Sequence, residues 1–117
     1  MGRLIVFVLV LFIGLHWYSN RGPAAGDPRT HTGRDGVVML SAEWCGYCDA
    51  LRSELKRIGV PYQELDIERD REGELAFDAL DARGVPVLVV GQDVIYGYDP
   101  AGARDLIAAA GHAISTP

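Results

Sequence analysis

The sequence predicts an α/β domain with a four-stranded mixed sheet and helices on both faces, preceded by an apolar N-terminal helix. Residues 37–40 and 86–90 are continuous apolar runs, as expected of central strands that are buried on both faces. Segments with helical periodicity alternate with these runs, which is typical of a sheet covered by helices. The expected order of elements in the domain is β-α-β-α-β-β-α.

The first helix of the domain follows the strand at residues 37–40. Cys48, Leu51 and Leu55 recur at spacings of three and four, which places them on one helix face, and Gly59 is a typical helix stop. Residues 62–67 then alternate between two sets of side chains, which suits an edge strand with one solvated face.

The second half of the domain contains two more helices and a hairpin. Residues 72–82 have an apolar face at helical spacing, and a two-residue turn at 91–92 joins the strand at 86–90 to one at 93–96. Asp99 is a good N-cap for the last helix, with Pro100 in its first turn. The first βαβ unit is expected to be parallel and right-handed, and the closing hairpin antiparallel.

Residues 1–19 are predicted to be a signal peptide or a signal anchor. Residues 4–15 lack any polar side chain. The length of this run suits the apolar core of a signal peptide, whereas a helix that crosses a membrane usually takes about 20 residues. We expect residues 4–18 to engage a membrane, with cleavage left open and a buried core helix as the alternative. Arg3 and Arg21 give little charge bias to membrane orientation.

Residues 20–35 combine glycine, proline and charged residues without periodicity, so they are predicted to be a flexible linker to a domain at residues 36–113. From residue 36 onward the chain has seven basic and fourteen acidic residues, a net charge of −7. Such a surface repels phosphate backbones, so nucleic acid is not expected as a partner. The domain is expected to be monomeric.

Cys45 and Cys48 are the only cysteines and lie where the first strand ends and the next helix begins. A helix N-terminus offers free N–H groups and positive potential, which favour a thiolate. Two intervening residues, Gly46 and Tyr47, let both sulfurs lie on the first turn. We therefore assign Cys45 as the nucleophile and Cys48 as the resolving thiol of a disulfide-exchange pair.

The cysteine pair has two alternative roles, as zinc ligands or as a purely structural disulfide. A zinc site needs about four ligands, and the three histidines (His16, His31 and His112) lie in the apolar run, the linker and the tail. A disulfide that closes so short a loop constrains the unfolded chain little, which argues against a purely structural bridge. No metal or prosthetic group is expected.

Val85 and Pro86 open the third strand, where proline removes no ladder hydrogen bond that is needed. A cis peptide bond here would turn the Val85 backbone toward a substrate peptide beside the cysteines, and an ordinary trans proline is the alternative. Trp44 and Tyr47 would frame the sulfur with apolar surface, unless they pack locally.

Three segments, SAEWCGYC at 41–48, GVP at 84–86 and GYD at 97–99, occur in the order and places seen in glutaredoxins. Residues 36–111 resemble that family, although the residues leading into Cys45 are similar to thioredoxin, and CGYC is also found in periplasmic disulfide isomerases and some dithiol glutaredoxins. The resemblance implies a thioredoxin fold, Cys45 as attacking thiol and Pro86 in cis. It also implies that glutathione or a peptide contacts the following residues: the Val85 main chain, Gly97, Tyr98 and Asp99.

The sequence also departs from the glutaredoxin pattern. Ala42 stands where a lysine is usual, and Gly84 where threonine is common. Glu43 and Asp49 flank the motif, and nearby carboxylates disfavour both a thiolate and an anionic ligand such as glutathione. Glutathione is therefore a candidate co-substrate but not the favoured one, and a protein dithiol or a reductase is the alternative partner.

These observations predict a thiol–disulfide oxidoreductase that reduces or exchanges protein disulfides, with its domain tethered to a membrane on the extracytoplasmic side. A cleaved soluble form in that compartment and a domain on the cytoplasmic side are alternatives. Two other functions are retained: an iron–sulfur-binding glutaredoxin in which Cys45 and glutathione hold a cluster between subunits, and a non-catalytic docking module. The direction of electron flow is left open, since reduction potentials within this fold differ widely.

Overall fold

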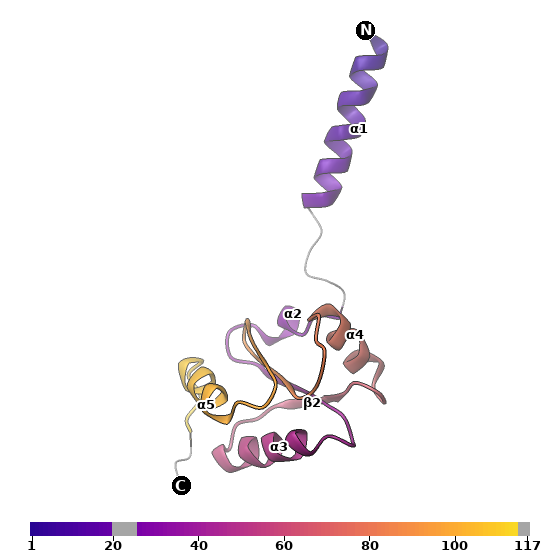
Figure 1. The fold of residues 1–117 in the computed structure, drawn as a ribbon. Helices are drawn as coiled ribbons and strands as arrows, with labels where there is room; N and C mark the ends of the chain where they lie inside the picture. The colour runs from indigo at the N-terminus through magenta and orange to yellow at the C-terminus, as the bar shows by residue number, and fades with distance from the viewer. Residues whose placement is uncertain (20–25, 115–117) are drawn as a thin grey trace.

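The computed structural model describes residues 1–19 and 26–114 (Figure 1). Its elements, in chain order, are α1 (Gly2–Ser19), α2 (Arg29–Thr32), β1 (Val37–Ser41), α3 (Gly46–Ile58), β2 (Gln63–Asp66), α4 (Arg71–Ala79), β3 (Val87–Val90), β4 (Asp93–Tyr96) and α5 (Pro100–Ala109). From β1 onward this order is the predicted β-α-β-α-β-β-α.

The sheet has the strand order β2-β1-β3-β4. Strand β1 pairs in parallel with β2, Leu40 lying opposite Leu65, and antiparallel with β3, Met39 lying opposite Leu88. The β3–β4 hairpin is antiparallel. Both central strands are buried along their whole length, whereas only Leu65 of edge strand β2 is buried, as its alternating sequence predicted. The four-stranded mixed sheet predicted from the sequence pattern is therefore confirmed.

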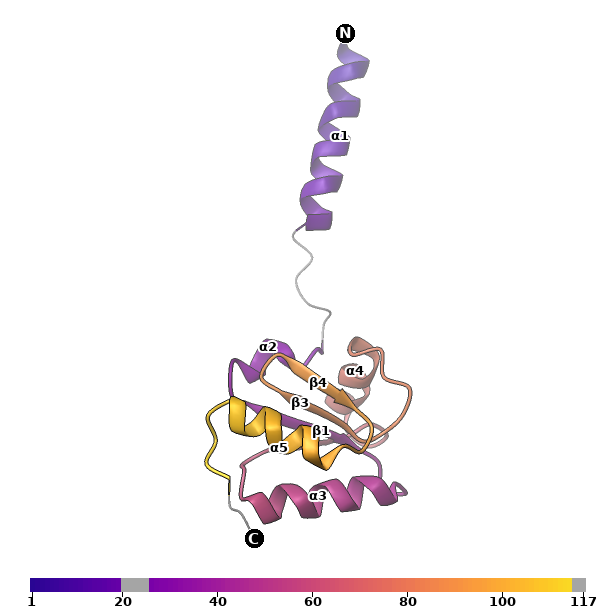
Figure 2. The ribbon, with the colours of Figure 1, turned by 60° about the vertical axis from the view of Figure 1, so that its left-hand side comes forward.

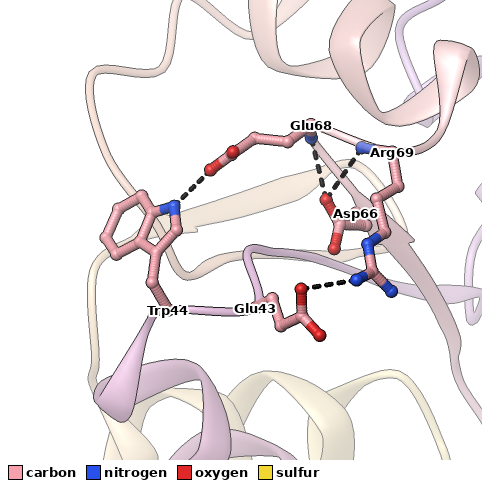
Figure 3. Close-up of a pocket in the computed structure, with 5 residues that line it drawn as sticks. All are labelled: Glu43, Trp44, Asp66, Glu68 and Arg69. Carbon is pink, nitrogen blue, oxygen red and sulfur yellow. Dashed lines mark hydrogen bonds and ion pairs between the residues drawn. The ribbon is translucent and has the colours of Figure 1, made fainter.

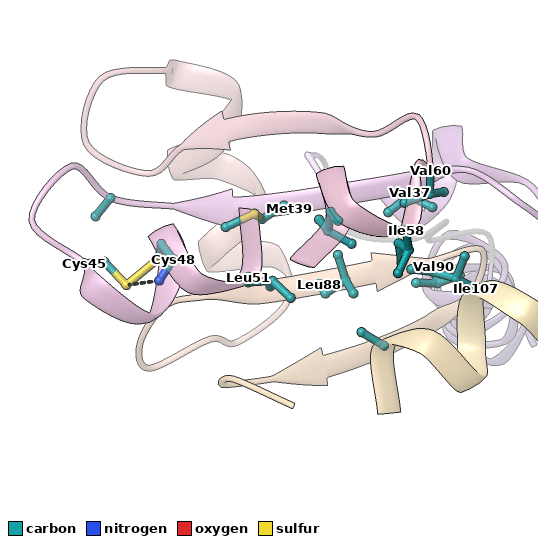
Figure 4. Packing of buried hydrophobic residues seen from close by; sticks show 13 residues of the cluster. Val37, Met39, Cys45, Cys48, Leu51, Ile58, Val60, Leu88, Val90 and Ile107 are labelled. Carbon is teal, nitrogen blue, oxygen red and sulfur yellow. Dashed lines mark hydrogen bonds between the residues drawn. A yellow bond between two sulfur atoms is a disulfide. The ribbon is translucent and has the colours of Figure 1, made fainter. Parts of the chain in front are cut away.

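Side chains of alternate residues in β1 and β3 supply two core layers, one on each face of the sheet. The larger layer packs helices α3 and α5 against one face, and Figure 4 shows part of it around Met39 and Leu88. The smaller layer packs α4 against the other face through Ala76 and the C-cap residue Leu80. Figure 2 shows α3 and α5 together on one side of the strands and α4 on the other. The sheet is thus covered on both faces, which fixes the end of β1 from both sides.

Helix α1 corresponds to the apolar segment predicted for residues 1–19, and residues 1–18 are exposed. Across residues 1–19 and 26–114, the structure contains no helix whose length and apolar character suffice to cross a membrane. The uninterrupted apolar run, residues 4–15, would extend about 18 Å, against about 30 Å of bilayer hydrocarbon. The prediction that residues 4–18 anchor the chain in a membrane is therefore not supported.

The flexible linker predicted for residues 20–35 is wrong for residues 26–35, while 20–25 lie outside the described residues. The Asp27 side chain is 2% exposed and binds the Arg29 guanidinium at 2.7 Å. The Thr32 hydroxyl donates to the Gly91 carbonyl, and the Gln92 amide donates to two carbonyls of the segment at 2.9 Å. Polar bonds to the backbone, rather than an apolar face, attach this segment to the domain.

Helix α4 begins and ends close to its predicted range of 72–82, and Gly73 determines how it meets the sheet. A Cβ at Gly73 would collide with the backbone carbonyl of Asp66, at the end of β2. Glycine therefore allows the first turn of α4 to approach the β2 terminus. This close approach keeps the connection at residues 67–70 short and beside the end of β1.

We expect Asp27→Asn to lower the free energy of unfolding at neutral pH by about 1–3 kcal/mol, because it removes a charge-assisted hydrogen bond from a buried group. Hydrogen bonding from Arg29 holds the pKa of Asp27 below its ordinary value of 3.8. A carboxyl group whose pKa is lower in the folded than in the unfolded state stabilises the fold at pH values above the unfolded-state pKa. This stabilisation is lost as the pH falls through the folded-state pKa. Urea unfolding of the wild type and of Asp27→Asn should therefore show a difference in the free energy of unfolding that narrows below about pH 4. Equal stability at neutral pH would contradict this role.

Candidate active site

Cys45 and Cys48 form a disulfide across the start of α3, with their Cα atoms 5.2 Å apart (Figure 4). Cys45 is the N-cap residue, and Cys48 lies in the first turn. Cys45 is 4% exposed and Cys48 is fully buried. The structure therefore brings the two predicted redox residues together at the predicted strand-to-helix junction, with the first sulfur nearer to solvent.

The backbone around Cys45 is arranged to stabilise a thiolate. The Cys48 N–H donates to the Cys45 Sγ at 3.1 Å, so this sulfur takes the place that a serine or aspartate oxygen takes in an ordinary N-cap. A sulfur in that position also meets the positive end of the helix dipole. Both effects favour the negatively charged form once the disulfide is reduced.

The Val85–Pro86 peptide bond is cis, as the resemblance implied. The Val85 carbonyl oxygen lies 3.7 Å from the Cys45 Sγ, close enough to accept from the thiol of the reduced protein. The Gly97 N–H donates to the Pro86 carbonyl at 2.9 Å, which joins this loop to the turn before α5. Val85, Pro86 and Gly97 therefore lie on one side of the sulfur pair.

The rings of Tyr47 and Tyr98 stack, with centroids 5.6 Å apart and planes at 30°. Both side chains are exposed, Tyr47 more than Tyr98, so the pair forms a surface feature and not a part of the core. The Asp99 carboxylate accepts from the Gly102 N–H at 3.0 Å and caps α5, as predicted. The structure thus unites two aromatic residues that the sequence had placed 51 positions apart.

The side of the site that carries Trp44 was only partly foreseen. Glu43, Trp44, Asp66, Glu68 and Arg69 line a cavity of about 230 Å³ (Figure 3). The sequence pattern singles out Trp44 as a contact residue but none of residues 66–69. The available signal was topological: parallel strands end at the same edge of the sheet, so residues that follow β2 lie beside residues that follow β1.

Both carboxylates that flank the cysteine motif have a guanidinium partner. Arg69 binds Glu43 at 2.5 Å, and Arg52 binds Asp49 at 2.6 Å and Glu64 at 2.8 Å. Hydrogen bonds from Arg52 lower the pKa of Glu64. These cations offset part of the negative charge that was expected to disfavour a thiolate at Cys45.

A second cavity, of about 340 Å³, opens next to the cis-proline loop. Asp81, Arg83, Gly84, Tyr96 and Gly97 line it. The Tyr96 hydroxyl donates to the Leu80 carbonyl at 2.7 Å, which fixes the ring at this wall. Gly84, the position where glutaredoxins commonly have threonine, therefore borders open space next to Val85.

Comparison with known proteins agrees with this geometry. A sequence model of the glutaredoxin family matches residues 37–95, which hold the cysteine pair, the cis-proline and all but the last residue of the β3–β4 hairpin. The chain belongs to the glutaredoxin family. It has the thioredoxin-like α/β fold of that family, whose members are in general thiol oxidoreductases.

Proteins similar to this glutaredoxin carry names that describe different activities or ligands. N-acetyl-S-hydroxy-L-cysteine reductase of Bacillus subtilis is 30% identical over 80 residues, 66% of this chain and 86% of the relative. A buckwheat glutaredoxin–glutathione complex is 24% identical with a TM-score of 0.58, covering 74% of this chain and 88% of that one. NrdH-redoxin from Escherichia coli is 21% identical with a TM-score of 0.55, covering 60% of this chain and 92% of that one. It is a glutaredoxin-like protein described as having a thioredoxin-like activity profile. The two structures share the fold.

In the reduced protein, Cys45 should react with iodoacetamide well before Cys48, because its sulfur is nearer to solvent and receives the Cys48 N–H. Brief alkylation at neutral pH, followed by peptide mass spectrometry, measures the order of modification. The Cys45→Ser protein is the matched control, since its remaining thiol should stay slow. Faster modification of Cys48 would contradict the assigned roles.

Proposed function

We propose that this protein exchanges disulfides with protein substrates, with Cys45 as the attacking thiol and Cys48 as the resolving thiol. The observation that carries the proposal is the bond from the Cys48 N–H to the Cys45 Sγ at the start of α3, above a fully buried second sulfur. This arrangement supports a stabilised thiolate at Cys45 and a second thiol within bonding distance.

In the reducing direction, the Cys45 thiolate attacks one sulfur of the substrate disulfide. The substrate S–S bond breaks, one substrate thiolate leaves and takes up a proton, and a mixed disulfide joins Cys45 to the other substrate sulfur. Cys48 then gives up its proton and attacks the Cys45 Sγ, which expels the second substrate thiol. Two electrons have passed to the substrate, and Cys45–Cys48 is oxidised. A dithiol reductant restores the pair by the same steps, so no prosthetic group is needed.

The surface around Cys45 favours an extended peptide as the substrate. Trp44 and Tyr47 are 71% and 67% exposed, and Tyr98 is 40% exposed. Exposed aromatic rings beside a reactive group are typical contact residues, because they supply large apolar area with little conformational entropy to lose. The cis-proline loop adds backbone groups at Val85 with which a peptide can pair. Glutathione remains a candidate reductant at the same loop.

The Bacillus subtilis relative supports a second candidate, reduction of the sulfenic acid of a small cysteine derivative. Here the Cys45 thiolate attacks the sulfenic sulfur, the S–O bond breaks and hydroxide leaves as water after protonation. Cys48 resolves the mixed disulfide as before, and two electrons again pass to the substrate. The two candidate reactions use the same two cysteines. Only the reaction with a protein substrate needs the exposed aromatic residues as peptide contacts.

We expect Cys45→Ser to reduce protein-disulfide reduction to the uncatalysed rate, because it removes the nucleophile. Turbidity during insulin reduction, with dithiothreitol or glutathione as the reductant, measures this. Cys48→Ser should instead accumulate a mixed disulfide with the substrate, visible as a mass increase lost on reduction. Full activity of Cys45→Ser would refute the proposal. Activity of the wild-type protein on a sulfenic acid but not on insulin would select the second candidate.

A further inference from the structure

Two side-chain contacts, which we call the brace, join the loop between β1 and α3 to the connection between β2 and α4. The Trp44 indole N–H donates to the Glu68 carboxylate, and the Arg69 guanidinium binds Glu43 at 2.5 Å. Figure 3 shows both bonds crossing the cavity between the two loops. Trp44 directly precedes Cys45, whose N–H donates to the Ala42 carbonyl at 3.2 Å. The brace therefore acts on the turn that carries the nucleophile.

Glu68 is held in place by the residue that ends β2. The Asp66 carboxylate accepts from the N–H of Glu68 at 2.8 Å and from the N–H of Arg69 at 3.0 Å. The Ile67 N–H donates to the Ser41 carbonyl at 2.9 Å, which joins this loop to the end of β1. The backbone of the acceptor loop is thus fixed before its side chains reach across to Glu43 and Trp44.

The bond between Trp44 and Glu68 is not needed to satisfy a buried group. Trp44 is 71% exposed, and Glu68 is exposed as well, so water could serve both polar atoms. A hydrogen bond between exposed side chains contributes little to the stability of the fold. What it does change is the orientation of the indole, because a large ring that could rotate freely in solvent is held at one angle beside Cys45.

We propose that Glu68 is a positioning residue: it fixes the Trp44 ring as a contact surface for a protein substrate at Cys45. This inference rests on the proposed protein-disulfide exchange and names a residue to which that function had assigned no part. Holding the ring in place before binding lowers the ordering cost of association, so the benefit falls on the substrate that touches the ring. A small disulfide that reaches only the sulfur gains nothing from it.

The test compares Glu68→Ala with Glu68→Gln, which keeps an oxygen acceptor for the indole. Glu68→Ala should raise KM for insulin by roughly two- to tenfold, the range expected for the ordering cost of one side chain, with kcat and turnover of a small disulfide unchanged. Glu68→Gln should restore the wild-type KM. Trp44→Ala should raise KM at least as much, and adding Glu68→Ala to it should have no further effect.

Fluorescence gives a readout that does not depend on activity. The chain has two tryptophans, so a Trp17→Phe background leaves Trp44 as the sole tryptophan, whose emission is followed. A disulfide quenches a nearby indole, and the ratio of emission in the reduced and oxidised protein therefore reports the ring's position relative to Cys45–Cys48. Glu68→Ala should change this ratio, and Glu68→Gln should preserve it.

Glu74→Ala is the matched control, since Glu74 is also exposed and in an ion pair, with Arg71 at 3.2 Å, but outside the brace. It should behave as the wild type in every assay. The inference is overturned if Glu68→Ala matches the wild type in KM and fluorescence, if it slows the small disulfide equally, or if its effect adds to that of Trp44→Ala. An inactive wild-type protein would instead refute the proposed function, and the fluorescence ratio would still report whether Glu68 positions the ring.

Discussion

The hydrogen bond from the Cys48 N–H to the Cys45 Sγ joins the fold of this protein to its chemistry. It exists because β1 ends at Ser41 and α3 begins at Gly46, so that Cys45 occupies the N-cap position. The first N–H groups of a helix have no partner within the helix and need an acceptor. A sulfur there completes the helix and at the same time acquires an environment that favours its ionised form. One position in the chain therefore serves both local structure and reactivity.

The surrounding packing keeps that junction in place. Leu51, Leu55 and Ile58 of α3 are buried against Met39 and the other side chains on one face of the sheet, which fixes the axis of the helix. On the opposite face, α4 approaches the end of β2 through Gly73. The loop that leads into Cys45 thus lies between two packed layers and a third contact, the connection after β2. Rigid support of this kind is what a reactive group on a loop requires.

Short-range patterns in the sequence predicted the parts of the fold that depend on short-range physics. The buried runs of β1 and β3, the helical spacing from Cys48 to Ile58 and the Asp99 cap each appear within a few residues. The contacts of Trp44 with Glu68 depend on the pairing of β1 with β2, which joins segments 24 positions apart. The packing of residues 26–35 was missed for another reason: polar bonds to backbone carbonyls hold it, and such bonds leave no periodic signal.

The attachment of α2 has a geometric consequence for how the domain can be tethered. Thr32 is bonded to Gly91, which follows β3, and Val90 of β3 lies opposite Val37 at the beginning of β1. Cys45 follows the other end of β1, so residues 26–35 lie at the end of the sheet opposite the reactive sulfur. A support surface, label or fused domain joined ahead of residue 26 would accordingly be fastened to the back of the molecule, with the sulfur-bearing end turned outward to arriving partners.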